Sequence, residues 1–188
     1  MSEIKMLING QAVAAAETFP VINPATETVI TECPKATQRH LDDAVAAARA
    51  AFPAWSAKPI DERRDVLLKI ADRLEENLPE LAQLLSEEQG KPAEGFAGLG
   101  AMFELGGALA WIRYTASLDL PIDVIQDNDE ARIEVHRKPV GVVASITPWH
   151  YPLLILCWHV MPGLLAGCTA VAKPSEYTPL TVLRAMHL

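Results

Sequence analysis

The chain has 188 residues, half of them hydrophobic and 21% charged, and its 16 Lys and Arg against 24 Asp and Glu give a formal net charge of -8. This length is enough for one well-packed domain, and the apolar content excludes a disordered chain. The acidic balance, without a concentrated basic face, argues against nucleic-acid binding, because phosphate contacts depend on clustered cations.

The cysteines and the first residues bear on the compartment. Cys33, Cys157 and Cys168 form no CxxC pair, so no disulfide framework or zinc ribbon is predicted and we expect no metal site. The opening MSEIKMLING lacks the apolar stretch of a signal peptide. Together these features predict a reduced, cytoplasmic environment.

One segment is apolar enough to raise the question of a membrane span. Residues 151–172 carry no Asp, Glu, Lys or Arg and are numerous enough to cross a bilayer. Pro152, Pro162 and two glycines interrupt the segment, and His159 lies in its middle. This composition favours a buried helix followed by a buried strand, so we expect no membrane contact.

Residues 1–36 are predicted to form short β-strands. Asn9-Gly10, flanked by apolar residues, is a strong signal for a two-residue hairpin turn, and Asn23-Pro24 marks a second turn. These strands carry too little apolar surface to stand alone, so we expect them to dock on the rest of the chain.

Residues 37–130 are predicted to form a helical segment. Thr37 can cap a first helix with an apolar face from Leu41 to Phe52, and Pro53 is expected to end it.

Two further helices are expected in this segment. The second begins near Pro59, with an apolar stripe over residues 67–74, and the third begins at Asn77, where Glu80 completes a capping box. Gly90 is expected to stop the third helix.

An apolar stretch at 93–118, rich in small residues, predicts a closely packed helix. Gly95, Gly98 and Gly100 resemble a nucleotide loop, but their spacing is the reverse of GxGxxG and no strand precedes them. A loop is expected next, up to the acidic run at 127–130.

The spacing of apolar residues changes from a helical to a strand-like period in the last unit, residues 131–188. Residues 132–135 alternate as in a half-exposed strand, whereas 141–146 and 168–172 read as buried parallel strands on either side of a helix at 153–167. The predicted fold class is therefore α/β: an incomplete Rossmann-like doubly wound parallel sheet, preceded by N-terminal β-hairpin strands and a helical segment.

Two polar loops, 147–152 and 173–179, follow the carboxyl ends of these strands, where such sheets bind ligands. Glu176 lies about where a Rossmann unit places its ribose-binding acid, while Lys173 and Ser175 offer donors. Two prolines make the first loop a poor pyrophosphate cradle, because they lack an N–H. The residues alone leave two interpretations: a nucleotide site, or two ordinary loops in which Lys173 and Glu176 form a surface ion pair.

The segment SITPWHYPLLILCWHVMPGLLAGCTAVAKPSEYTPLT resembles the cofactor-domain core of the aldehyde dehydrogenase superfamily, whose pattern is close to TPWN[FY]P, a helix, and AxG[NC]xx[VL]xKP[SA]ExTP. INPATETVI and AFPAWSAKPIDERRDVLLKIADRLEEN are similar to that family's N-terminal region, so the resemblance covers essentially the whole chain. It implies an NAD(P)-dependent enzyme that oxidises an aldehyde to a carboxylic acid through a cysteine thiohemiacetal. It also implies a homo-oligomer at full length.

The resemblance implies that the first loop lines the nicotinamide side of NAD(P) and that the second holds the adenosine ribose. A carboxylate at the ribose favours a free 2′-hydroxyl, so NAD is the first choice and NADP stays open. The implied cofactor-binding residues are Ile146, Thr147, Pro148 and Trp149 at the first loop and Lys173, Ser175 and Glu176 at the second.

One residue departs from the family pattern, which has Asn where this chain has His150. In the family that Asn donates a hydrogen bond to the oxygen of the tetrahedral intermediate, and losing such a donor costs about 2.7–4 kcal/mol. We hypothesise that His150 occupies this oxyanion position and makes it weaker or pH-dependent. The alternative is a loop histidine without a catalytic part.

The family's nucleophilic cysteine and general-base glutamate lie downstream of the matched segments. We therefore expect the 188-residue chain to be inactive alone, because its three cysteines are poor substitutes. The alternative function is a truncated, non-catalytic form that binds nucleotide weakly or associates with an intact homologue.

Overall fold

The computed structural model describes residues 4–95 and 100–188, and begins with the two predicted hairpins. β1 (Met6–Ile8) pairs with β2 (Gln11–Val13), and β3 (Thr18–Asn23) pairs with β4 (Thr28–Pro34), both antiparallel. Asn9 and Gly10 have φ values of 53° and 71°. These left-handed conformations are the ones that a tight two-residue turn requires, so this turn is confirmed.

The helical segment contains α1 (Gln38–Ser56), α2 (Ile60–Glu76), α3 (Leu78–Gln89) and α4 (Ala101–Ala116). Thr37 caps α1 as predicted, because its hydroxyl accepts from the His40 N–H while His40 Nδ1 accepts from the Thr37 N–H. Gly90 ends α3 at φ 83°, a conformation that glycine adopts without steric cost.

The predicted end of α1 and the predicted capping box of α3 are wrong. Pro53 lies inside α1, which continues to Ser56, because a proline removes only one backbone donor and the Trp55 indole holds the last turn to the Leu164 carbonyl at 3.1 Å. Asn77 forms no capping box. Its side-chain amide donates to the Arg73 carbonyl at 2.8 Å, and Glu80 pairs with Arg184 instead.

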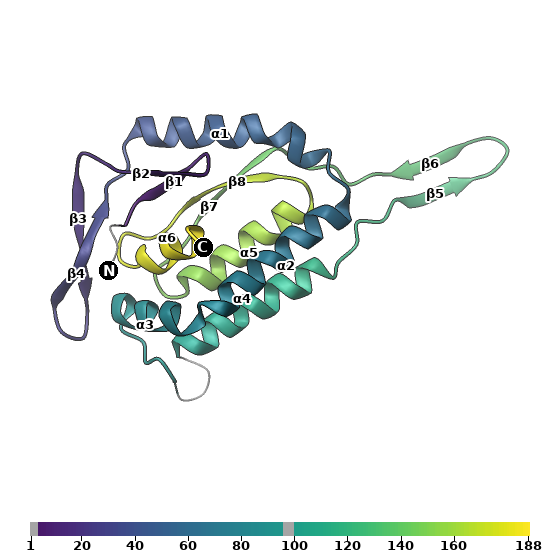
Figure 1. Ribbon diagram of the computed structural model, residues 1–188. Coiled ribbons are helices and arrows are strands. Elements are labelled where there is room, and N and C mark those ends of the chain that lie inside the picture. The colour runs from purple at the N-terminus through teal and green to yellow at the C-terminus, as the bar shows by residue number, and fades with distance from the viewer. Residues whose placement is uncertain (1–3, 96–99) are drawn as a thin grey trace.

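The start of the helix predicted at 93–118 and the loop predicted after it both need correction. The helix begins at Ala101, and Gly98 lies outside the described residues. The expected loop contains a strand, β5 (Asp123–Asp127), which pairs with β6 (Arg132–Val135) in a hairpin that projects from the molecule (Figure 1). A register shift between Val124 and Gln126 breaks the alternation of side chains, which explains why the period did not reveal β5.

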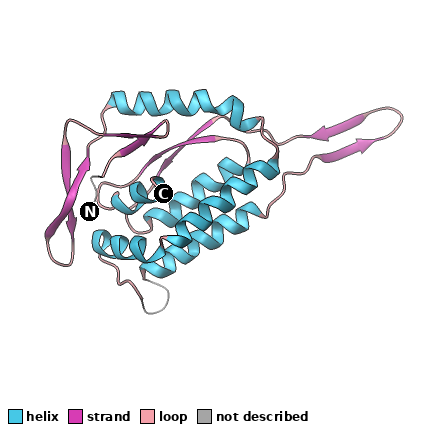
Figure 2. Cartoon of the chain, viewed as in Figure 1, coloured by secondary structure: helices cyan, strands magenta, loops and turns pink. Residues whose placement is uncertain are grey.

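The last segment forms the predicted βαβ unit: β7 (Val142–Ile146), α5 (Pro152–Leu165) and β8 (Thr169–Lys173), followed by α6 (Leu180–Met186). β7 and β8 are parallel. α1 covers one face of this strand pair and α5 packs on the other (Figures 1 and 2). Helices on both faces of a parallel pair confirm the α/β class.

The main core lies between the helices on the α5 side of the strands. Leu67, Leu81, Leu105 and Ile112 are fully buried there and represent α2, α3 and α4. By contrast, α1 has no fully buried residue, and Leu41 on its predicted apolar face is 48% exposed. Across the described part of the chain, no helix is both long and apolar enough to cross a bilayer.

Candidate functional site

The strand register brings Ile146 and Lys173 together as cross-strand partners at the carboxyl edge of the parallel pair. Val143 and Ser145 face α5, because Val143 lies against Gly163 and the Ser145 hydroxyl is 3.0 Å from His159 Nδ1. Side chains alternate along a strand, so Ile146 points to the opposite face, where it is 72% exposed. An apolar side chain and a cation therefore share one open edge of the sheet.

The second loop places an acid beside this cation. Lys173 Nζ lies 3.4 Å from Glu176 Oε2, and both side chains are exposed. The pKa of Glu176 is lowered by its own backbone N–H and by the Lys173 ammonium. Ser175, predicted as a further donor, is buried, and its hydroxyl accepts the Tyr177 N–H at 3.2 Å. Ser175 thus shapes the turn that presents Glu176.

The first loop, 147–152, is anchored through its backbone. The Thr147 N–H donates to the Lys173 carbonyl at 3.1 Å, and the Thr178 hydroxyl donates to the Trp149 carbonyl at 3.4 Å. Thr147 itself is buried, and its hydroxyl has no hydrogen-bond partner among the described residues. Pro148 is half-buried.

The outward side chains of this loop are Trp149, which is 52% exposed, and His150. The structure therefore presents four predicted site residues to solvent at one edge: Ile146, Trp149, Lys173 and Glu176. His150 is also exposed, and its ring lies 6.0 Å from that of Trp149.

Sequence reasoning missed a buried ion pair beneath the first loop. Lys91 Nζ lies 2.5 Å from Glu104 Oε2, with the two side chains 8% and 0% exposed. Lys91 also donates to the His150 carbonyl at 2.8 Å. The signal available in the sequence is that Glu104 is the one charged residue in the apolar run 101–112.

The other Glu104 oxygen caps α5. Its Oε1 accepts the N–H groups of Leu153 and Leu154 at 2.9 and 3.2 Å. A helix N-terminus carries partial positive charge and unpaired N–H groups, so it attracts anions. Because Glu104 already satisfies these groups, the N-terminus of α5 is not available to a pyrophosphate, in agreement with the proline-rich loop before it.

A second buried carboxylate holds α6 in the same way. Glu88 in α3 accepts the N–H groups of Leu180 and Thr181, directly after the second loop. Burial raises the pKa of Glu88 to about 7, and the nearby Glu104 adds to this effect.

The opposite end of α5 is held by cations and donors. The buried Arg63 donates through Nε to the Leu165 carbonyl at 2.8 Å, and the Trp55 indole donates to the Leu164 carbonyl. The Glu104 carboxylate lies at the positive N-terminal end of the helix dipole and the Arg63 guanidinium at its negative C-terminal end, so both charges stabilise the helix. The helix that carries the first loop is therefore fixed at both ends.

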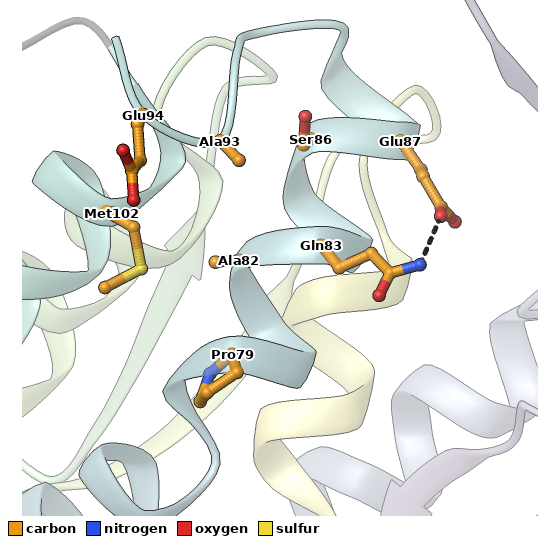
Figure 3. A pocket seen from close by; sticks show the side chains of 8 residues that line it. All are labelled: Pro79, Ala82, Gln83, Ser86, Glu87, Ala93, Glu94 and Met102. Atoms are coloured by element: carbon orange, nitrogen blue, oxygen red, sulfur yellow. Dashed lines mark hydrogen bonds between the residues drawn. The ribbon is translucent and has the colours of Figure 1, made fainter.

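Two pockets on the molecule differ in the residues that line them. A groove of about 940 Å³ between α1, β1 and β8 includes Lys173, Ser175 and Glu176 in its lining. A smaller pocket of about 410 Å³ between α3 and the start of α4 has Glu87 and Glu94 as its charged residues (Figure 3). Only the larger groove contains residues predicted for cofactor binding.

The three cysteines are buried and free, as their predicted inertness requires. Burial raises the pKa of Cys33 to about 12, with a contribution from Glu88, and that of Cys157 to about 12, with a contribution from Glu104. A thiol with such a pKa is protonated at neutral pH and is a poor nucleophile.

These elements define the class: an α/β protein built on a Rossmann-like parallel βαβ unit with two loops at one edge. The model of the aldehyde dehydrogenase family matches residues 12–188, and the chain belongs to that family.

Relatives and solved structures agree with this assignment. The phenylacetaldehyde dehydrogenase of Pseudomonas fluorescens is 39% identical over 201 aligned residues, which cover 98% of this chain and 38% of that protein. The NAD+ complex of an aldehyde dehydrogenase from Bacillus cereus superposes with a TM-score of 0.91 at 37% identity, covering 98% of this chain and 38% of that one. An NADP-dependent enzyme of E. coli gives 0.91 at 33% identity, with the same coverage. The chain thus spans about two fifths of the length of these proteins.

Proposed function

We propose that this chain supplies the first part of an NAD(P)-dependent aldehyde dehydrogenase that oxidises an aldehyde to a carboxylic acid. The observation that carries the proposal is the shared edge of Ile146 and Lys173, with Glu176 3.4 Å from the Lys173 ammonium. This edge lies at the carboxyl ends of two parallel strands, the position where such sheets bind nucleotides.

The exposed groups at this edge fit a dinucleotide. A ribose diol can donate to the ionised Glu176 and accept from Lys173, while Ile146 and Trp149 offer apolar surface to a nicotinamide ring. Thr147 and Pro148 shape the first loop and Ser175 the second. When bound, the cofactor supplies a hydride acceptor for the aldehyde carbon.

We propose NAD as the first choice of cofactor, with NADP possible. The ionised Glu176 repels the 2′-phosphate of NADP, whereas the Lys173 ammonium attracts it. Similar proteins support each option: the Bacillus cereus aldehyde dehydrogenase was solved as an NAD+ complex, and the E. coli enzyme is NADP-dependent.

We propose His150 as the oxyanion residue, because its side chain is exposed beside Trp149 while its carbonyl is held from below. An imidazole N–H in this position stabilises the negative oxygen that forms when a nucleophile attacks the aldehyde. His150→Asn is expected to raise turnover and flatten its pH profile. Unchanged rate and pH profile would remove His150 from the mechanism.

The test uses the protein at the length its gene encodes, with NAD+ or NADP+ and a panel of aliphatic and aromatic aldehydes. The expected result is formation of NADH or NADPH, with one carboxylate for each hydride transferred. No oxidation of any aldehyde, together with retained binding of NAD+ by Trp149 fluorescence, would favour the alternative of a non-catalytic, nucleotide-binding form.

We also propose that the complete protein is a cytoplasmic homo-oligomer that binds no nucleic acid or membrane. The projecting β5–β6 hairpin supports the oligomer, because it exposes Val124, Ile125, Ile133 and Val135. Free cysteines support a reducing compartment. Light scattering tests the oligomeric state, and cell fractionation tests the cytoplasmic location.

A further inference from the structure

We propose that Lys91 and Glu104 are positioning residues that set the direction of the His150 side chain; the kinetic consequence of this inference rests on the proposed function. Neither side chain reaches the open edge of the site. They act through the backbone of the loop that carries His150.

Lys91 makes three contacts with one buried ammonium. Its Nζ lies 2.5 Å from Glu104 Oε2, donates to the His150 carbonyl at 2.8 Å, and lies 4.2 Å from the centre of the Tyr151 ring. An ammonium has three protons, and these contacts give it an anion, a carbonyl and an aromatic face. The side chain is therefore fixed in one orientation.

Both peptide groups that flank His150 are held from different elements. The Trp149 carbonyl accepts from Thr178, and the His150 carbonyl accepts from Lys91. Since two fixed peptide planes leave little freedom to the Cα between them, they determine where the Cβ of His150 points.

Glu104 completes the restraint from the other side. Its Oε1 binds the N–H groups of Leu153 and Leu154, so the residues that follow the loop cannot shift along the α5 axis. One carboxylate thus links Lys91 to the first turn of α5, so this buried pair holds both the His150 carbonyl and the residues that follow the loop.

Positioning matters here because a donor helps only within hydrogen-bond distance of the developing oxyanion. A displacement of about 1 Å in such a group is enough to lower a rate about 100-fold. We therefore expect Lys91→Met to lower kcat about tenfold or more while the KM for NAD+ changes less than about threefold, since the ribose-binding loop has its own anchor in Glu88.

The experiment compares Lys91→Met and Glu104→Gln in the protein at its encoded length. Peptide-level hydrogen exchange over residues 147–154 is the first readout and needs no activity. Both variants are expected to exchange about tenfold faster in this segment. Arg113→Met is the matched control, because Arg113 is on the same helix as Glu104 but its partner, Glu75, is exposed.

Steady-state kinetics are the second readout, and Leu74→Ala serves as a core variant that lowers stability away from the loop. Unchanged exchange over 147–154 in Lys91→Met would overturn the inference. An equal loss of kcat in Leu74→Ala and Lys91→Met would also overturn the inference, because the loss in Lys91→Met would then be explained by lower stability alone. If the unaltered protein oxidises no aldehyde, the proposed function fails, and the exchange result still decides the positioning.

Discussion

The Glu88 carboxylate in α3 accepts a hydrogen bond of 2.7 Å from the backbone N–H of Leu180, a residue 92 positions later in the chain. Glu104 in α4 does the same for α5. Each of the two helices that follow the loops 147–152 and 173–179 is therefore capped by a buried carboxylate from the helical layer. The loops take their positions from this layer as well as from the strands.

The raised pKa of Glu88 makes stability depend on pH. Its folded pKa of about 7 lies above the ordinary value of 4.5, so between these two values the folded state holds a proton that the unfolded state has lost. The contribution of Glu88 is therefore full below pH 4.5 and declines as the pH rises to about 7, by a few kcal/mol at most.

Urea unfolding at several pH values between 4.5 and 8 measures this decline. Glu88→Gln, which does not titrate, is expected to give a flatter curve. The neighbouring Glu87→Gln should keep the original slope. A Glu88→Gln curve as steep as that of the unaltered protein would contradict the prediction.

Removing one partner of the Lys91–Glu104 pair is expected to be costly. Lys91→Met leaves the fully buried Glu104 without its cation, and such a loss destabilises proteins by about 3–5 kcal/mol. The double variant Lys91→Met/Glu104→Gln should recover part of this loss, because no unpaired charge remains. A double-mutant cycle in urea tests this, and strictly additive losses would speak against direct coupling.

Arg63 is expected to stabilise the C-terminal end of α5. Arg63→Met removes the donor to the buried Leu165 carbonyl together with the bonds to the part-buried Ser56 and Lys58 carbonyls. The expected loss in the free energy of unfolding is about 2 kcal/mol. Arg39→Met, at a side chain that is 89% exposed, is the control and should change stability little. Equal losses in both variants would refute the role of Arg63.

The buried thiols are expected to react slowly in the folded protein. Residues 1–188 should release thionitrobenzoate from Ellman's reagent only slowly at neutral pH, and rapidly in denaturant, because Cys33 and Cys157 are protonated and enclosed. The same chain should form no NADH from NAD+ and aldehydes. A fast-reacting thiol in the native chain would contradict the predicted burial of the cysteines, and replacing the cysteines one at a time would identify the accessible one.

The charge of Glu176 is expected to affect the choice between the two cofactors. Glu176→Gln removes the negative charge 3.4 Å from Lys173, so the KM for NADP+ should fall about tenfold while that for NAD+ rises. The ratio of kcat/KM for the two cofactors measures this change. Glu27→Gln, at an exposed turn between β3 and β4, is the control. An unchanged ratio would place Glu176 away from the ribose.

Local chemistry was enough to predict much of the fold. The Asn9-Gly10 turn, the Thr37 cap, the Gly90 stop and the βαβ unit depend on residues within a few positions of one another or on a repeating apolar pattern. The exposed edge residues Lys173 and Glu176 were also predicted, because the ends of parallel strands must meet at one edge of a sheet.

The amino-acid sequence by itself thus determined most of the elements, their order and the two loops at the carboxyl edge, but not the strand β5. Only the tertiary structure decided what holds those loops, since Lys91 and Glu104 contact residues 150–154 from about 50 to 60 positions away. Such contacts depend on helix packing, which no local pattern encodes. The same reason explains why α1 continues past Pro53 and why Glu80 pairs with Arg184: partners brought close by packing outweigh local preferences.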